Sequence, residues 1–329
     1  MRRRSDPRGQ LPVRLPITGD SALMTDSSAQ RHPLTPYVLL TLTMLFWSGS
    51  SVVANWLKDV MSPEAINFGR WGSSLLLLAP WTARELLAKR AVLFRDWKLF
   101  ALLAFTGAAG FHTLTYWSLH WTTVSNNGLI QSIMPLCIMA TSWLLYRDRV
   151  GKRLAAGMTS SLLGVLVILT RGNLDVVREL SFNPGDLLVV TAVVLWSLYA
   201  VLLRRRPIEL SPLALLEAIT IYTVIELLPV IAVESVWGHP VVWSWKVAAG
   251  IMYLGIFAAA LANLFWNEAS HRIGPNRAAP FVHLLPLFSL LLGVGLVGER
   301  LHLYHAPAIG LILGGIGLAT APRLWGKSS

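Results

Sequence analysis

Long apolar segments recur along the chain from Tyr37 onward, separated by short polar connections. A run of about 20 apolar residues matches the thickness of the hydrocarbon core of a bilayer. The pattern therefore predicts an all-α integral membrane protein with ten transmembrane helices. The predicted spans are 37–56, 63–82, 99–118, 125–146, 152–170, 184–203, 212–233, 246–268, 276–297 and 303–322.

The two ends of the chain lack this pattern. Residues 1–36 are polar, and no apolar run of signal-peptide length follows the arginines at 2–4 before Tyr37. We interpret 1–36 as a disordered cytoplasmic tail, with Met24 as an alternative start, and 323–329 as a second cytoplasmic tail.

The stretch from Leu119 to Arg149 recurs 151 residues later in the chain. At this offset Pro135 matches Pro286, and Asp148-Arg149 matches Glu299-Arg300. Upstream, Trp47-Ser48 matches Trp196-Ser197 at an offset of 149 residues. The repeat predicts two halves of five helices each, 37–171 and 184–322. Because five is odd, the second half enters the membrane from the opposite side, so the halves are predicted to be inverted repeats.

Lysine and arginine are distributed unevenly between the two predicted sides. One side carries Arg31, Arg84, Lys89, Arg90, Arg95, Lys98, Arg147, Arg149, Lys152, Arg153, Arg204, Arg205, Arg206, Arg272, Arg277, Arg323 and Lys327; the other carries Lys58, Arg171, Arg178, Lys246 and Arg300. The positive-inside rule places the first side, with both termini, in the cytoplasm.

Composition agrees with a membrane protein, since 54% of residues are hydrophobic and 14% are charged. The net charge of +11 does not indicate nucleic-acid binding, because the basic residues lie between the spans and form no basic face. Cys137 is the single cysteine, so no intrachain disulfide forms.

Several of these features together resemble the ten-span EamA-type transporters of the drug/metabolite transporter superfamily. They are the Trp47-Ser48 opening span, Ser62-Pro63 leading to Arg70, Pro135 before Asp148, their counterparts in the second half, and a glycine-rich last span. The resemblance covers about 37–322. It implies export or exchange of small amphipathic metabolites, amino acids among them, across a bacterial inner membrane, with no cofactor.

Arg70 is the first candidate for substrate binding. It shares one face of a predicted helix with Asn67 and Ser74, at spacings of three and four residues. An arginine inside a span costs at least about 2.5 kcal/mol on insertion scales, so it marks a functional site by default. The alternative is that Arg70, seven residues past Pro63, extends its side chain to the outer headgroups.

Other polar and aromatic residues of the predicted spans are candidates for the same cavity. Besides Asn67, they are Trp47, His112, Tyr116, Gln131, Trp196, Tyr199, Asn263 and Trp266. As a set they favour a shared polar cavity with aromatic walls for an amphipathic solute. Taken one at a time, each is explained as readily by hydrogen bonds or packing between helices.

Glu217 is the candidate for carrying a coupling proton, because it falls inside a span where a carboxyl can exchange a proton during a transport cycle. Gly310 and Gly314 form a GxxxG pattern, which predicts close helix packing within one chain or between the two chains of a homodimer.

Competing function classes leave weaker traces in the sequence. ATP-driven transport would need a P-loop, and the terminal Gly326-Lys327-Ser328 lacks the required glycine at position 321. No metal-binding motif is evident, and no nucleophile and base are brought together. We therefore predict a secondary transporter, a non-enzyme that exports a small molecule by alternating access. A membrane enzyme such as an acyltransferase, and a passive channel, are the alternatives.

Overall fold

The structure is a computed structural model that describes residues 34–118, 120–122, 124–173, 183–237, 241, 243–297 and 301–320. Within these ranges the chain forms helices and no strand. In chain order they are α1 (Thr35–Leu57), α2 (Pro63–Ala88), α3 (Arg90–Arg95), α4 (Trp97–Ala104), η1 (Phe105–Ala109), α5 (Gly110–Ser118), α6 (Val124–Gln131), α7 (Met134–Tyr146), α8 (Lys152–Leu169), α10 (Pro184–Leu202), η2 (Leu203–Arg205), α11 (Pro212–Trp237), α12 (Trp245–Tyr253), η3 (Leu254–Leu261), α13 (Ala262–Ile273), α14 (Pro275–Ala278), η4 (Ala279–His283), α15 (Leu284–Leu292), η5 (Gly293–Val297) and α16 (His305–Thr320).

Eight helical segments of the described chain are long and apolar enough to cross a membrane, and each coincides with one of the predicted spans. They are Thr35–Leu57, Trp97–Ser118, Asn127–Tyr146, Lys152–Leu169, Pro184–Arg205, Pro212–Glu234, Trp245–Ile273 and Pro275–Gly295. The predicted spans 63–82 and 303–322 fall on α2, which carries several charged residues, and on α16, which has only 16 residues. The count of ten spans therefore stays a prediction.

Local sequence fixes where several of these helices begin. Ser62 caps α2 by accepting a hydrogen bond from the backbone N–H of Ala65, and Pro63 occupies the first helical turn, where its missing N–H costs nothing. Asn183 and Asp186 form a reciprocal capping box at the start of α10.

Three membrane-spanning segments of the described chain contain π-helical residues, in η1, η3 and η5, and the first two occur at corresponding positions of the two halves. The π-helix η1 begins at Phe105 and η3 begins at Leu254, the same offset of 149 residues that separates Trp47 from Trp196. A π-helix has a wider hydrogen-bond spacing than an α-helix, and such turns often occur at functional sites. Gly107 in η1 allows a close approach, because a Cβ there would lie 2.4 Å from the ring of Tyr199.

Two segments are interrupted in the middle. The segment Asn127–Tyr146, which coincides with the predicted span 125–146, consists of α6 and α7, separated at Ser132 and Ile133. Pro135 causes the break, because it cannot donate to the carbonyl one turn before it. In the second half, the 3-10 turn η4 separates α14 from α15. His283 joins the two breaks by donating to the carbonyl of Ser132 at 3.1 Å, while its Nδ1 accepts from Ser161 at 2.6 Å.

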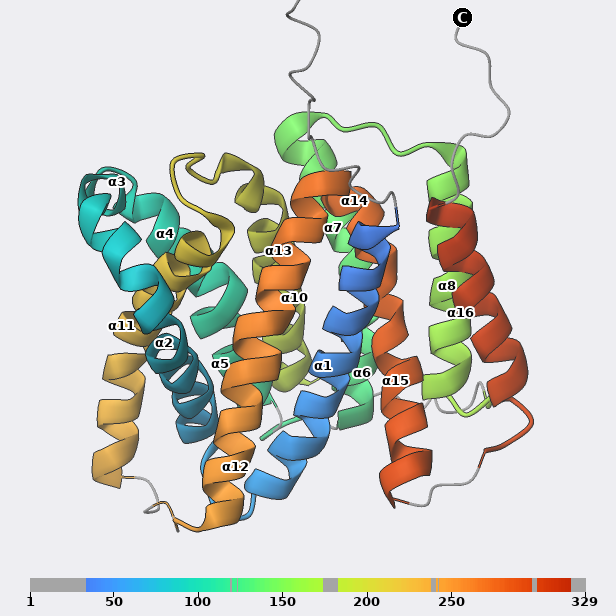
Figure 1. The fold of residues 1–329 in the computed structure, drawn as a ribbon. Helices are drawn as coiled ribbons and strands as arrows, with labels where there is room; N and C mark the ends of the chain where they lie inside the picture. Colours follow the sequence, from blue (N-terminus) through green and yellow to red (C-terminus); the bar gives the residue numbers. More distant parts are fainter. Residues whose placement is uncertain are drawn as a thin grey trace, which may run out of the picture. The chain divides into compact units, whose positions relative to one another are not determined.

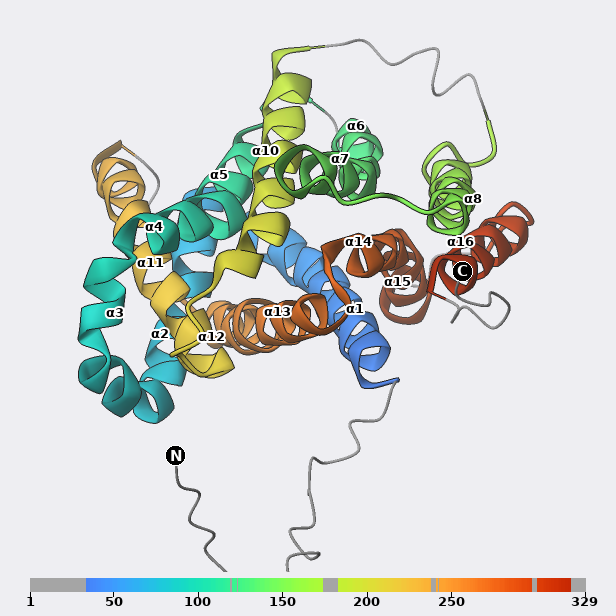
Figure 2. The same cartoon turned by 90° about the horizontal axis from the view of Figure 1, so that it is seen from above.

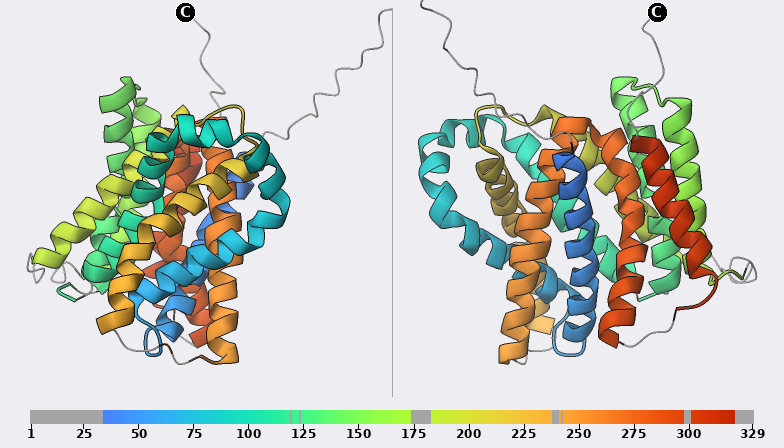
Figure 3. Two further views of the ribbon diagram at one scale, coloured as in Figure 1. Left: turned by 90° about the vertical axis from the view of Figure 1, so that its left-hand side faces the viewer. Right: turned by 45° about the vertical axis from the view of Figure 1, so that its right-hand side comes forward.

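The first helix of each half packs mainly against helices of the other half. Helix α1 contacts α13, η3 and α15 of the second half, and α10 contacts α5, η1 and α7 of the first half. Figure 1 and the right-hand view of Figure 3 show α1 lying between α13 and α15. Helix α2 packs against α11, and α8 against α16, as Figure 2 shows from above.

Glycine brings α8 and α16 together, but not at the predicted pair. A Cβ on Gly157 would lie 2.5 Å from the carbonyl oxygen of Gly315, and a Cβ on Gly315 would lie as close to that of Gly157. Gly310 and Gly314 have no neighbouring atom within 4 Å of the Cβ position. The prediction that Gly310 and Gly314 mediate packing within the chain is therefore wrong, and the alternative of packing between two chains stays a prediction.

Several sequence predictions lie outside the described residues. They concern tail residues 1–33 and 323–329, the dipeptide Glu299-Arg300, and Arg178.

Candidate substrate-binding site

Arg70 lies deep among the helices, with a relative exposure of 4%, so the alternative that it extends to the headgroups is wrong. Its guanidinium donates to His112 Nε2 at 3.0 Å and to the carbonyl of Ala258 at 2.9 Å. No ion pair within the described ranges involves Arg70. The site therefore holds a buried positive charge without a carboxylate beside it.

The contact with Arg70 fixes the protonation of His112. A guanidinium can only donate, so Nε2 of His112 accepts, and the ring proton lies on Nδ1, which donates to the carbonyl of Ala108 at 3.0 Å. Around this pair lie the ring of Trp71, 5.6 Å from the Arg70 guanidinium, and the ring of Tyr116, 6.1 Å from that of His112. The predicted residues Arg70, His112 and Tyr116 are therefore brought together by α2 and α5.

The carbonyl oxygen of Ala258 is shared by three side chains. Besides Arg70, it accepts from Trp47 Nε1 at 3.1 Å and from Asn263 Nδ2 at 3.1 Å. Ala258 belongs to the π-helix η3, where the change of hydrogen-bond spacing leaves carbonyls accessible to side chains. This oxygen joins α1 and α2 of the first half to the second half.

Aromatic side chains gather next to this oxygen. Trp47, Trp196 and Trp266 form a triangle with ring centroids 5.1, 5.7 and 6.0 Å apart. Tyr199 lies 5.2 Å from Trp196 and donates its hydroxyl to Asn267 at 2.6 Å. The predicted wall residues Trp47, Trp196 and Tyr199 thus lie together with Trp266, another predicted candidate, and the four come from three different helices.

Many polar atoms in this region are buried but have no hydrogen-bond partner among the described residues. They are both amide atoms of Asn67, Nε of Arg70, Nε1 of Trp71, Trp196 and Trp266, the hydroxyls of Ser74 and Ser270, and Nδ2 of Asn267. An unsatisfied buried polar group costs about 1–3 kcal/mol. Such a concentration indicates a place where a polar ligand or water supplies the missing partners.

Gln131 belongs to a different polar group. Its side chain donates to Asn127, and Asn127 donates to the hydroxyl of Ser118 at 3.1 Å. No hydrogen bond of the described residues joins Gln131 to Arg70 or to the tryptophans, so we place it outside the candidate site. His283 was not among the predicted residues, although a histidine inside an apolar span, three residues from both Pro280 and Pro286, could have indicated it.

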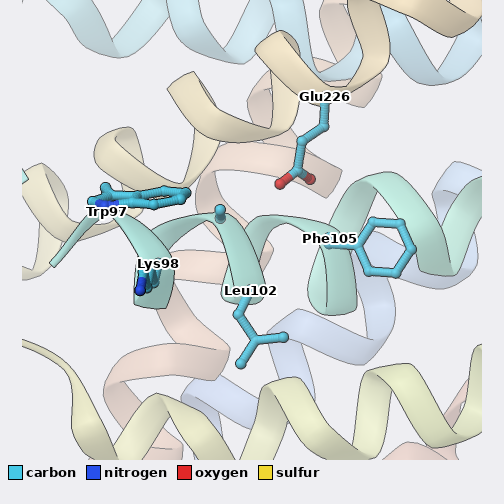
Figure 4. A pocket seen from close by; sticks show the side chains of 6 residues that line it. Trp97, Lys98, Leu102, Phe105 and Glu226 are labelled. Carbon is cyan, nitrogen blue, oxygen red and sulfur yellow. The ribbon is translucent and has the colours of Figure 1, made fainter.

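Two carboxyls of α11 lie within its membrane-spanning part. Glu217 has a relative exposure of 1%, and the Oε2 atoms of both carboxyls are buried without a partner in the described part of the chain. Glu226 lines a wide hollow of about 540 Å³, whose other walls come from α4 and from Phe105 of η1. Figure 4 shows its carboxylate pointing toward the helix that carries Leu102 and Phe105. Glu217 is therefore the more enclosed of the two.

At the end of the molecule that carries most of the basic residues, Asp148 is held by both halves. It accepts from Arg204 and from Ser142, both at 2.5 Å, and Asn276 lies 3.5 Å away. These hydrogen bonds, with that of Arg204 the strongest cause, lower the pKa of Asp148 below its ordinary value. The Asp148–Arg204 ion pair links the connection that follows α7 to η2 at this end.

Comparison with known proteins decides the class of this protein. Residues 34–170 and 183–321 both match the EamA-like transporter family. The chain belongs to the EamA-like transporter family. A similar protein, the uncharacterized transporter YyaM of Bacillus subtilis, is 27% identical over 87% of this chain and 92% of its own length. An uncharacterized transporter of Archaeoglobus fulgidus is 26% identical over 87% of this chain and 98% of its own.

A solved crystal structure shares the fold of this EamA-like chain. It superposes with a TM-score of 0.70 and 21% identity, covering 87% of this chain and 96% of the other. Family membership and the named relatives make the protein a multi-pass membrane transporter and not an enzyme. It works within a lipid bilayer on a small-molecule substrate.

Proposed function

We propose that this EamA-like protein is a secondary exporter of small amphipathic metabolites that carry a carboxylate, such as amino acids and their relatives. It works in a bacterial inner membrane with both termini in the cytoplasm. The substrate binds between Arg70, Asn67 and the tryptophan triangle, near the middle of the membrane. The observation that carries the proposal is the buried guanidinium of Arg70, which has no carboxylate partner in the described structure.

A buried charge without a counter-charge is expensive, and an anionic ligand offsets that expense. A carboxylate can accept two parallel hydrogen bonds from a guanidinium, and the unpartnered Nε of Arg70 is available for one of them. Asn67 offers a free donor and a free acceptor on the same face of α2. The tryptophans suit the apolar part of an amphipathic solute.

The pairing of irregular features supports ten spans arranged as two inverted five-helix repeats, 37–171 and 184–322. The π-helices η1 and η3 occupy corresponding positions, and so do the breaks before α7 and α15. Interrupted helices at corresponding positions in two halves are typical of the binding region of transporters that work by alternating access. In this proposal the inverted repeat also explains why α1 packs on helices of the second half and why α10 packs on helices of the first half.

Glu217 is the residue that we propose to carry a coupling proton. A carboxyl couples a proton gradient to transport when it is dry in one state and reaches water in another. In this structure Glu217 is enclosed, on a helix that packs against α2, the helix of Arg70.

The proposal is tested by flux into proteoliposomes with a panel of radiolabelled amino acids and related acids. A carrier gives saturable flux and exchange of internal for external substrate, whereas a channel gives flux that rises linearly with concentration. Arg70→Leu should abolish flux of carboxylate substrates. Arg84→Leu, the same change at an exposed position of the same helix, is the matched control and should transport normally. Flux of carboxylates by Arg70→Leu at the wild-type rate would refute the site.

A further inference from the structure

A second cavity lies at the inner ends of α10 and α13. Its volume is about 280 Å³, and its walls are Ala200, Leu203, Arg204, Ser270, His271, Gly274 and Pro275. Arg204, which lines it, is the partner of Asp148 in the tie between the halves. The cavity therefore opens at the end of the molecule where the basic residues gather, next to a contact that a movement of the halves would break.

A polar stripe on α13 leads from this cavity toward the middle of the membrane. Ser270, Asn267 and Asn263 follow one another at spacings of three and four residues, so they share one face of the helix. The stripe from Ser270 to Asn263 extends about 10 Å along the helix axis, at about 1.5 Å per residue. Ser270 lines the cavity, and Asn263 contacts the Ala258 oxygen that also binds Arg70.

The stripe is buried, and two of its polar atoms have no partner in the described structure, while Asn263 Nδ2 and Asn267 Oδ1 are hydrogen-bonded. Ser270 and Asn267 have relative exposures of 4% and 2%, and the Ser270 hydroxyl and Asn267 Nδ2 have no partner in the described ranges. A helix face that only held neighbouring helices together would have these groups paired. Unpaired donors on a buried face could instead bind water or a polar solute that passes along α13 in another conformation of the transporter.

A hydrogen bond joins α10 to α13 at the residues that precede the cavity lining. Tyr199 donates to Asn267 across the stripe at 2.6 Å, and its ring packs on Trp196 on one side and over Gly107 on the other. The next residue, Ala200, already lines the cavity. Tyr199 is thus the last side chain of α10 between the cavity and the candidate site.

We propose that this cavity is the cytoplasmic vestibule of the transport path, that the solute moves along the α13 stripe, and that the Tyr199–Asn267 contact is the gate between the vestibule and the site. The inference rests on the proposed function. The vestibule takes the carboxylate end of the solute, because Arg204 and His271 are in its wall and Arg204 exchanges Asp148 for the incoming anion. The described structure has this gate closed.

The vestibule is tested by cysteine modification in a Cys137→Ser background. Ser270→Cys places a thiol in the vestibule, and Arg272→Cys is the matched control, two residues on, where the native side chain pairs with Glu268 away from the stripe. A membrane-impermeant methanethiosulfonate is applied to inverted vesicles and, separately, to right-side-out vesicles. Reaction at Ser270→Cys from the cytoplasmic side should block flux, and reaction at Arg272→Cys should not. Flux that persists after complete modification of Ser270→Cys would overturn the vestibule.

The gate is tested without any substrate. Asn263→Cys places a thiol beyond Tyr199, and its rate of modification from the cytoplasmic side reports how often the gate opens. Tyr199→Phe keeps the ring and removes the hydrogen bond, so the rate should rise severalfold. Tyr222→Phe, which removes a hydroxyl from α11, is the control and should leave the rate unchanged. An unchanged rate in Tyr199→Phe would overturn the gate.

The two readouts separate failure of this inference from failure of the proposed function. Modification rates depend on the gate and not on any solute, so they test it even if the panel contains no transported compound. If Arg70→Leu abolishes flux but modified Ser270→Cys still transports, the binding site stands and the vestibule is refuted. If modified Ser270→Cys is blocked but Arg70→Leu transports carboxylates, the vestibule stands and the binding site is refuted.

Discussion

Arg70 donates to Nε2 of His112, and this contact joins α2 to α5 at the centre of the candidate site. The histidine is a neutral acceptor that holds one arm of the guanidinium, while Nε of Arg70 keeps a free N–H. The geometry of Arg70 toward a ligand therefore depends on a residue that needs no contact with the ligand.

Replacement of His112 should weaken substrate binding through Arg70. His112→Leu leaves a guanidinium N–H without an acceptor, which costs about 1–3 kcal/mol. We expect a severalfold rise in KM and a lower apparent Tm in detergent. His112→Gln keeps an acceptor and should recover most of the KM. A KM that is unaffected in His112→Leu would contradict the positioning role.

Arg70→Lys distinguishes a paired hydrogen bond from charge alone. Lysine keeps the positive charge but cannot form two parallel hydrogen bonds with a carboxylate. We expect a severalfold loss of affinity in equilibrium binding by the purified protein, with normal expression. Equal affinities of Arg70→Lys and wild type would show that Arg70 acts only as a charge.

Glu217→Gln should uncouple transport from the proton gradient. The amide cannot carry a proton, so gradient-driven accumulation in vesicles should disappear while substrate exchange at equal pH continues. Glu226→Gln is the matched control on the same helix, at the hollow of Figure 4, and should keep accumulation. If accumulation survives in Glu217→Gln and is lost in Glu226→Gln, the roles of the two carboxyls are reversed.

Reporter fusions test the orientation that the basic residues predict. Alkaline phosphatase is active only outside the cytoplasm, so fusions ending near Arg90, Arg149 and Arg205 should be silent. Fusions ending near Trp121 and Gly238 should be active. Activity at Arg90 or Arg205 would contradict cytoplasmic termini and the inversion of the halves.

Acid should weaken the Asp148–Arg204 tie. The pKa of Asp148 is lowered in the folded protein, so its contribution to stability is complete above the ordinary aspartate value of about 3.9 and is lost as the pH falls through the lower folded value. Apparent Tm should therefore fall less steeply below about pH 4 in Asp148→Asn than in wild type. Asp59→Asn, at an exposed carboxyl after α1, should follow the wild-type curve.

The sequence predicted the regular parts of this structure well. Apolar runs located eight helices with membrane-spanning properties, and spacing on one helical face linked Arg70 to Asn67 and Ser74. Trp47, Trp196 and Trp266 were each predicted as substrate-binding candidates, but no local pattern predicts that three different helices bring their rings together.

The irregular parts could not be predicted from local pattern. The π-turn at Ala258 is held by side chains of Trp47 and Arg70, both about 200 residues away in the chain. Pro135 itself indicated a possible break in the helix. However, proline is tolerated inside transmembrane helices when neighbouring side chains bind the backbone groups that it leaves without a partner. In this protein the neighbour is His283, which binds Ser132 at the break.

The oxygen of Ala258 has one further consequence. A carbonyl has two lone pairs, yet this one receives hydrogens from Trp47, Arg70 and Asn263. The three donors therefore compete, and each bond is weaker than it would be alone. An anion that draws Arg70 away would strengthen the other two bonds and loosen α2 while tightening α1. Ligand binding at Arg70 would in this way change how firmly the Ala258 oxygen holds α1 and α2.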